Sequence, residues 1–158
     1  VVEGLATVLL DTVDEGNSVG FLTGFTLDDA RRWWQATIDD PRIITWVALD
    51  GERIVGCVRL ILAKEENGLH RAEVGKMLVL RDSRRLGLGI KLLEALEAQA
   101  IREGRWLLVL DTLTDSPAEV FYQRLGWTVA GIIPDYATDT FNVPEPATFY
   151  WKRLPRPE

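Results

Sequence analysis

The residues that decide the fold lie in the middle of the chain, at Ala72–Gly104, and read AEVGKMLVLRDSRRLGLGIKLLEALEAQAIREG. An apolar run at 77–80 predicts a strand, and the later part of the stretch has the apolar spacing of a helix. Between them lies a basic turn that carries Gly87 and Gly89. Unpaired N–H groups and the positive dipole end meet at the start of a helix, so this turn is suited to bind phosphate.

Spacing within the turn narrows the class of ligand. In the pattern Arg84-x-x-Gly87-x-Gly89, we expect a Cβ at either glycine to stand between the backbone amides and a diphosphate. The sequence has no GxxxxGK[ST] of a P-loop, and Leu92 stands where the dinucleotide-binding fingerprint has its third glycine. The turn therefore predicts a phosphorylated ligand other than a nucleoside triphosphate or a nicotinamide. An ordinary strand-to-helix turn with a solvated basic rim is the alternative.

Composition limits the class of protein. The chain has 158 residues, 47% hydrophobic and 27% charged, which predicts one globular domain over residues 1–158. A formal net charge of −6 argues against a nucleic-acid partner, which needs a basic face. Without a membrane-length apolar run or a signal-peptide pattern, we expect a cytoplasmic protein with no membrane partner. One cysteine and one histidine leave no His/Cys metal cluster, and we expect Cys57 to be a buried strand thiol rather than a nucleophile.

Periodicity and turn residues predict the other elements. These are helices at 5–13, 26–38 and 116–125, and strands at 43–49, 53–63, 106–110, 127–133 and 148–154, with a hairpin turn at Asp50-Gly51 and a loop at 134–146. The continuous apolar run at 106–110 is typical of a strand covered on both faces. It therefore predicts a parallel crossover from the central strand.

Two motifs in this order resemble those of the GNAT superfamily of acetyl-CoA-dependent N-acetyltransferases. The turn with its flanking residues, from Val79 to Gly89, is similar to motif A, and AEVFYQRLGW at 118–127 is similar to the A-x-x-F/L-Y-x-x-x-G-F/W segment. Further stretches look like the tabtoxin-resistance type of GNAT acetyltransferase, over nearly the whole chain from Leu5 onward: SVGF at 18–21, NGLHRAEVGKMLVL at 67–80, LDT at 110–112, AEVFY at 118–122 and PATFYWK at 146–152.

The resemblance implies an α/β (α+β) fold with a mixed, mostly antiparallel sheet, a splayed central strand pair and flanking helices. The family usually begins with a strand ahead of the first helix, whereas only 1–4 precede Leu5 here, so that strand is missing or another element fills its edge. The family also often has proline where Arg81 stands and glycine where Arg85 stands.

The resemblance also implies transfer of an acetyl group from acetyl-CoA to an amine of a small molecule, without a metal. The acceptor would be an amino-acid-like compound or a β-lactam toxin, and a noncatalytic acyl-CoA-binding sensor or regulatory module is the alternative. The pantetheine arm would lie between the splayed strands and the pyrophosphate at the start of the helix, helped by charge from Arg81, Arg84 or Lys91. The residues that the resemblance assigns to the cofactor are Met77, Leu78, Val79, Arg84, Arg85, Leu86, Gly87, Leu88, Gly89 and Ile90.

Catalytic roles follow from the same comparison. Tyr122 matches the family tyrosine near the thioester sulfur, where its hydroxyl can protonate the departing thiolate. Asp111, at the end of a buried strand, is our first choice for the base that accepts a proton from the amine, with Glu73 as second choice and water as the third possibility. Each of these residues also has a purely structural alternative. Tyr122 would only pack within the fold, Asp111 would cap a turn, and Glu73 would face Arg71 or Lys76 in solvent.

We expect two variable loops, at 14–23 and 134–145, to determine the acceptor, and both are acidic, which favours a cationic amine. Solvated loop charge is the alternative. Of the neighbouring Trp33 and Trp34, one is expected in the core and the other on a groove or in solvent. The residues that we expect to bind the acceptor are Phe21, Trp34, Trp46, Asp135 and Tyr136. The chain is expected to be a monomer or a homodimer.

Overall fold

The computed structural model describes residues 1–17 and 19–158, so the serine of the SVGF stretch lies outside the described residues. In chain order the elements are α1 (Val2–Asp14), α2 (Leu27–Thr37), β1 (Ile43–Asp50), β2 (Arg53–Leu62), η1 (Glu66–Gly68), β3 (Arg71–Val79), η2 (Arg81–Ser83), α3 (Leu88–Arg102), β4 (Leu107–Leu113), α4 (Pro117–Arg124), β5 (Thr128–Thr138) and β6 (Pro144–Arg153). The predicted helices and strands are all present at these places.

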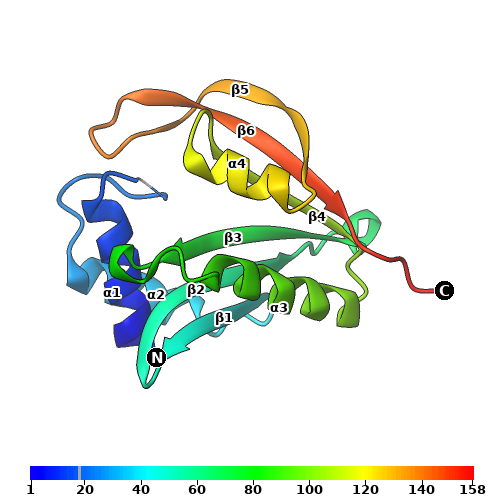
Figure 1. Cartoon of the computed structure of the whole chain (residues 1–158), viewed down its shortest axis with the longest axis horizontal. Coiled ribbons are helices and arrows are strands. Elements are labelled where there is room, and N and C mark those ends of the chain that lie inside the picture. The colour runs from blue at the N-terminus through cyan, green and yellow to red at the C-terminus, as the bar shows by residue number, and fades with distance from the viewer. Residues whose placement is uncertain (18) are drawn as a thin grey trace.

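The strands form one six-stranded sheet in the order β1-β2-β3-β4-β6-β5. Neighbouring strands are antiparallel except β3 and β4, which are parallel and are connected through α3. This confirms the expected mixed, mostly antiparallel sheet. Helices α1 and α2 pack against one face of its N-terminal half, and α3 and α4 cover the other face (Figure 1). Within the described part of the chain, the first element is α1 and β1 forms the edge of the sheet.

Each helix layer has its own hydrophobic core. The core under α1 and α2 includes Trp34 and Cys57, both without exposed surface, and the core under α3 and α4 includes Leu96 and Tyr150. Cys57 lies on β2 without exposed surface, which confirms a buried strand cysteine, and burial raises the pKa of its thiol to about 12. Within residues 1–17 and 19–158, no helix has both the length and the apolar composition needed to cross a bilayer.

The helix boundaries follow local chemistry. Thr26 caps α2, because its hydroxyl accepts a hydrogen bond from the Asp29 N–H at 3.1 Å while the Asp29 carboxylate accepts from the Thr26 N–H at 2.9 Å. Gly126 follows Leu125, the C-cap of α4, and its left-handed conformation at φ +87° ends the helix.

Two turns differ from the sequence expectation. The β1–β2 hairpin closes through Gly51 and Glu52, because Asp50 still pairs with Arg53. The predicted loop at 134–146 is largely strand, since β5 continues to Thr138 and β6 begins at Pro144. β5 is an edge strand with an irregular register between Ile133 and Ala137, and such a strand tolerates a proline without losing a needed hydrogen bond.

The turn before α3 owes its two glycines to different causes. Gly87 is the N-cap of α3 at φ +75°, a left-handed conformation, and a Cβ there would meet open space. A Cβ at Gly89 would lie 3.1 Å from both the Met77 Cε and the Phe121 Cζ. Gly87 thus serves the backbone turn and Gly89 serves packing, and the expected approach of an anion to their amides stays a prediction.

We predict that Gly87→Ala lowers the free energy of unfolding of the unliganded protein by about 1 kcal/mol, because an alanine is strained at positive φ. Urea unfolding monitored by tryptophan fluorescence measures this. Gly131→Ala is the matched control, because a Cβ there also meets open space and its φ is not in the left-handed region. Equal stability changes in the two variants would contradict the strain.

Candidate active site

The two central strands separate part of the way along their length. β3 and β4 pair only from Arg71–Leu107 to Glu73–Val109, although β3 continues to Val79 and β4 to Leu113. Beyond that point β3 stays bonded to β2, and β4 to β6 (Figure 1). The separation leaves an edge of β3 and an edge of β4 facing each other without ladder hydrogen bonds, which is the expected splayed pair.

A β-bulge lies on β3 beside this gap. Three residues of β2, from Cys57 to Arg59, face four of β3, from Gly75 to Leu78, and Lys76 adopts φ +46°. The Cys57 thiol donates to the Lys76 carbonyl at 3.4 Å, which ties the bulge to β2. The bulge bends β3 where it leaves β4.

The start of α3 lies at the end of β3, after η2 (Figure 1). Its first N–H groups, at 88–90, precede the first intrahelical bond, which runs from the Lys91 N–H to the Gly87 carbonyl at 3.2 Å. These groups, with the helix dipole, form the part of the turn that can accept an anion.

Most of the basic side chains of the turn already have acidic partners. Arg84 makes a two-pronged ion pair with the Glu15 carboxylate at the end of α1, which lowers the pKa of Glu15. The Arg81 N–H and Nε donate to the Asp11 carboxylate at 3.0 and 2.9 Å. The side chains of Arg81 and Arg84 are therefore held by acidic residues of α1, whereas Lys91 is exposed, and the assistance of either arginine to a pyrophosphate stays a prediction.

Arg85 lies in the left-handed region at φ +65°, at the position where the family often has glycine. Its side chain is exposed and makes no ion pair with any residue that the structure describes. Leu86 beside it is 68% exposed. Arg85 and Lys91 are thus the side chains of the turn that remain available to a phosphate.

Three charged groups surround the place where β3 and β4 part. Burial, and then the negative charge of Asp111, raises the pKa of the Glu73 carboxyl. Partial burial also raises the pKa of Asp111, although Glu73 and Asp111 both keep exposed surface, and the nearby Lys76 opposes both shifts. The structure thus brings together the two carboxylates expected from the sequence. Their raised pKa values bring them closer to the range in which a carboxylate can accept a proton near neutral pH.

Lys76 was not expected at the site. Its Nζ donates to the Val19 carbonyl at 2.8 Å and lies 5.6 Å from the Phe21 ring and 5.0 Å from the Trp33 ring. Burial, and then the positive charge of Arg59, lowers the pKa of the Lys76 ammonium. The positive φ at the bulge, which the sequence does not reveal, turns this side chain toward the loop before α2.

Tyr122 lies on α4 and is 6% exposed. Its ring makes edge contacts with Phe121 and Trp127, at centroid distances of 5.3 and 5.8 Å. Burial, and then the negative charge of Asp111, raises the pKa of its hydroxyl, which therefore stays protonated. A protonated hydroxyl within the field of Asp111 can act as a proton donor.

The aromatic residues expected around the acceptor do not form one wall. Trp34 is fully buried beneath α2, so it is the member of the Trp33–Trp34 pair that lies in the core. Trp33, rather than Trp34, contacts the Phe21 ring. Trp46 packs on the opposite face of the sheet, against the core under α3. Tyr136 instead makes an edge contact with Phe149, at a centroid distance of 4.9 Å.

The two acidic loops do meet. The Thr23 N–H donates to the Thr140 carbonyl at 2.7 Å, and a hollow of about 300 Å³ lies between these loops and the end of α1. Asp14 and Glu15 line it, but Asp135 does not. Asp135 is exposed at φ +55°, in the irregular part of β5.

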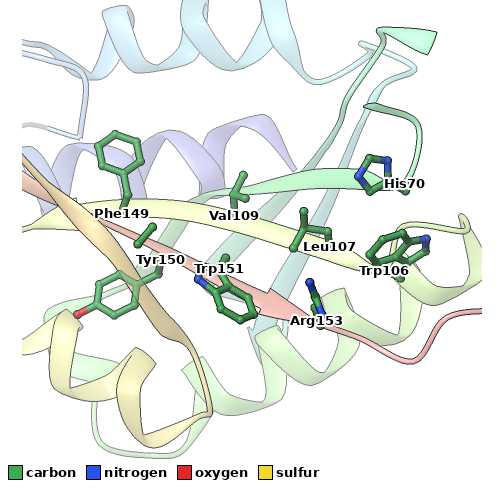
Figure 2. A pocket seen from close by; sticks show the side chains of 9 residues that line it. His70, Trp106, Leu107, Val109, Phe149, Tyr150, Trp151 and Arg153 are labelled. Atoms are coloured by element: carbon green, nitrogen blue, oxygen red, sulfur yellow. The ribbon is translucent and has the colours of Figure 1, made fainter. Parts of the chain in front are cut away.

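A larger pocket of about 540 Å³ lies on the face of β4 and β6 that α4 does not cover (Figure 2). Its lining residues are His70, Trp106, Leu107, Val109, Ala130, Phe149, Tyr150, Trp151 and Arg153. The sequence does not reveal this pocket, because strand alternation shows which side chains share a face but not which strands are neighbours. No group of three His, Cys, Asp or Glu side chains in the described part of the chain is placed to hold a metal ion.

The chain is similar to several proteins of known structure. The yncA protein of Salmonella typhimurium, solved with its cofactor acetyl-CoA, is 18% identical with a TM-score of 0.80, covering 99% of this chain and 90% of that one. Ribosomal-protein-alanine N-acetyltransferase from Brucella melitensis is 20% identical with a TM-score of 0.79, covering 95% and 92%. An aminoglycoside 6′-N-acetyltransferase complexed with coenzyme A is 20% identical with a TM-score of 0.72, covering 98% and 92%. These likenesses show a shared fold.

The sequence itself matches a family model. The model described as an acetyltransferase (GNAT) domain matches residues 41–129, more than half of the chain, from before β1 to the start of β5. The match spans the splayed strands, the turn before α3 and the helix that carries Tyr122. The chain therefore belongs to the GNAT family of acetyltransferases.

Proposed function

We propose that this protein transfers an acetyl group from acetyl-CoA to a primary amine of a small molecule. The observation that carries the proposal is the gap between β3 and β4, which has the free N–H groups of α3 at one end and the carboxylates of Glu73 and Asp111 at the other. A long cofactor with an anionic middle and a reactive tip fits such a gap.

The residues present fit acetyl-CoA. The unpaired edge of β3 at 77–79 would hold the pantetheine arm, as an added strand would be held. The pyrophosphate would be bound by backbone N–H groups of residues 84–90, with Arg85 and Lys91 as the available side-chain charges. Neighbours of the same fold solved with acetyl-CoA and with coenzyme A support this assignment.

Acetyl-CoA supplies an acetyl group activated as a thioester. An amine attacks a thioester only when it is neutral, so a group of the protein must take its proton. Asp111 is the first candidate, and Glu73 or a water held by either carboxylate is the alternative. As the new C–N bond replaces the C–S bond, the hydroxyl of Tyr122 gives its proton to the sulfur.

The acceptor class is the finer part of the proposal. Resemblance to the tabtoxin-resistance type favours an amino-acid-like compound or a β-lactam toxin. We further propose that residues 1–158 act as one catalytic unit, as monomer or homodimer. A noncatalytic sensor of acyl-CoA is the competing function, and it would keep the turn before α3 but would not need the hydroxyl of Tyr122.

We predict that Tyr122→Phe lowers kcat about a hundredfold, because the leaving thiolate loses its proton donor. Release of free CoA thiol, measured against a library of primary amines, gives the rate. The rise in melting temperature caused by acetyl-CoA should equal that of the wild-type protein, since the substituted ring keeps its edge contacts. Undiminished turnover in this variant would rule out Tyr122 as the acid, and thermal stabilisation without turnover on any amine would favour the sensor.

A second prediction concerns the base. At neutral pH, Asp111→Asn should lower kcat/KM about a hundredfold, because the amide cannot accept a proton. The ratio of wild-type to variant kcat/KM should fall toward one as the pH drops through the raised pKa of Asp111, since the wild-type carboxylate is then protonated. The same amine is used for both proteins, so protonation of the acceptor changes both rates equally and leaves the ratio of the two kcat/KM values unaffected.

Glu73→Gln is the matched control for the base. It removes the neighbouring carboxylate and should change the rate less than Asp111→Asn does. If Glu73→Gln has the larger effect, Glu73 is the base. If neither variant changes the ratio with pH, a protein carboxylate does not take the proton.

A further inference from the structure

We infer that the 540 Å³ pocket on β4 and β6 binds the acceptor, and that the acceptor is a short peptide of about three residues with a free amino terminus and a free carboxylate. The inference rests on the proposed acetyl transfer and names the substrate class of that site. It is carried by the register of the strands, by the charges at the two ends of the pocket and by the distance between them.

Strand register joins the pocket to the reaction centre. Asp111 is directly opposite Phe149 on β6, and Glu73 is directly opposite Val109 on β4. Residues paired in this way project from the same face of a sheet. Phe149 and Val109 both line the pocket, so Asp111 borders its near end and Glu73 lies beside its middle.

The far end of the pocket is basic and polar. Arg153 pairs with Leu107 and lines the pocket together with His70 and Trp106 (Figure 2). The His70 ring lies tilted against the Trp106 ring at a centroid distance of 4.8 Å, and the guanidinium of Arg156 lies 4.0 Å from the centroid of the same Trp106 ring. Among the residues described, Arg153 has no carboxylate partner, and its guanidinium lies 5.8 Å from the Trp151 ring.

The two ends are separated by a peptide-sized distance. From Leu107, opposite Arg153, to Asp111 there are four residues of extended strand, or about 13 Å. An extended tripeptide is about 10 Å long, and the side chains of Arg153 and Asp111 are long enough to span the rest of the distance to its two ends. The amine and carboxylate of a single amino acid are too close together to reach both ends.

The floor between the ends suits a middle residue with an apolar side chain. Leu107, Val109, Phe149 and Trp151 provide an apolar and aromatic surface, and Figure 2 shows them on β4 and β6 beside Arg153. A polycationic amine would place positive charge against Arg153 and Arg156. The charge pattern therefore favours a molecule with a cation at one end and an anion at the other.

The reaction on such a peptide balances in the way already derived. The amino-terminal nitrogen forms the C–N bond, its proton passes to a carboxylate or a water at the near end, and CoA leaves as the thiol. Arg153 touches only the far carboxylate of the peptide. It is therefore a specificity residue and should act on KM rather than on kcat.

The test uses the full chain with the tripeptide Ala-Phe-Ala as its free acid, the same tripeptide as its carboxyl-terminal amide, and spermidine. The wild-type protein should prefer the free acid over the amide about tenfold in kcat/KM, expressed in KM, because a charge-assisted hydrogen bond is lost in the amide. Arg153→Gln should remove this preference with little change in kcat. Arg102→Gln, at the exposed end of α3 on the other face of the sheet, should keep it.

Each other outcome separates the inference from the proposed function. Acetylation of spermidine but not of the peptides, or an acid preference that survives Arg153→Gln, overturns the inference and leaves the acetyltransferase. If no amine releases thiol, calorimetric binding of the free-acid peptide in the presence of CoA decides: binding that needs Arg153 supports the pocket and refutes catalysis, and no binding refutes both. A wild-type dimer that Trp151→Ala converts to a monomer without changing peptide selectivity would show that the pocket is a surface between two copies.

Discussion

The parting of β3 from β4 is the constraint on which the site depends. The parallel ladder ends after Glu73 and Val109, because β2 holds β3 through a bulge at Lys76 while β6 holds β4. Two strand edges then face each other across a gap, and an unpaired edge is a ready partner for an extended ligand. The connection from β3 to β4 places the start of α3 at one end of this gap. The candidate base carboxylates lie at the other end. The end of the β3–β4 ladder therefore positions both the backbone groups that would bind the cofactor and the carboxylates that would react.

Electrostatics divides the site into two parts that suit different charges. In the turn before α3, acidic residues of α1 engage Arg81 and Arg84, so the attraction for an anion rests on backbone N–H groups, Arg85 and Lys91. These ion pairs are exposed at the surface, and their role is to fix α1 against the turn rather than to add much stability. At the point where β3 and β4 part, partial burial raises the pKa values of the Glu73 and Asp111 carboxyls and lowers that of the Lys76 ammonium. These shifts bring the three groups closer to the range in which they can exchange protons near neutral pH.

Local sequence predicts those parts of the fold that local physics determines. The apolar run before Gly87, the turn and the helical spacing after it specify a strand, a turn and a helix, and the fully apolar strand at 106–110 specifies the parallel step. Contacts between distant segments could not be predicted in this way. The pairing of Arg84 with Glu15 joins residues far apart in the chain, and the phase of α2 decides that Trp34 rather than Trp33 is buried. The pocket on β4 and β6 exists because β6 lies between β4 and β5, an order that strand periodicity does not contain.

The central claim is that the gap and the start of α3 together bind acetyl-CoA. Amide hydrogen exchange of the full chain, measured by mass spectrometry with and without acetyl-CoA, tests this claim most directly, because it reports on the backbone groups themselves. Exchange should slow in the segments 77–79 and 86–90 when the ligand is added, and it should stay unchanged in the β1–β2 hairpin. Unchanged exchange in both segments at saturating acetyl-CoA, or protection confined to other parts of the chain, would contradict the account.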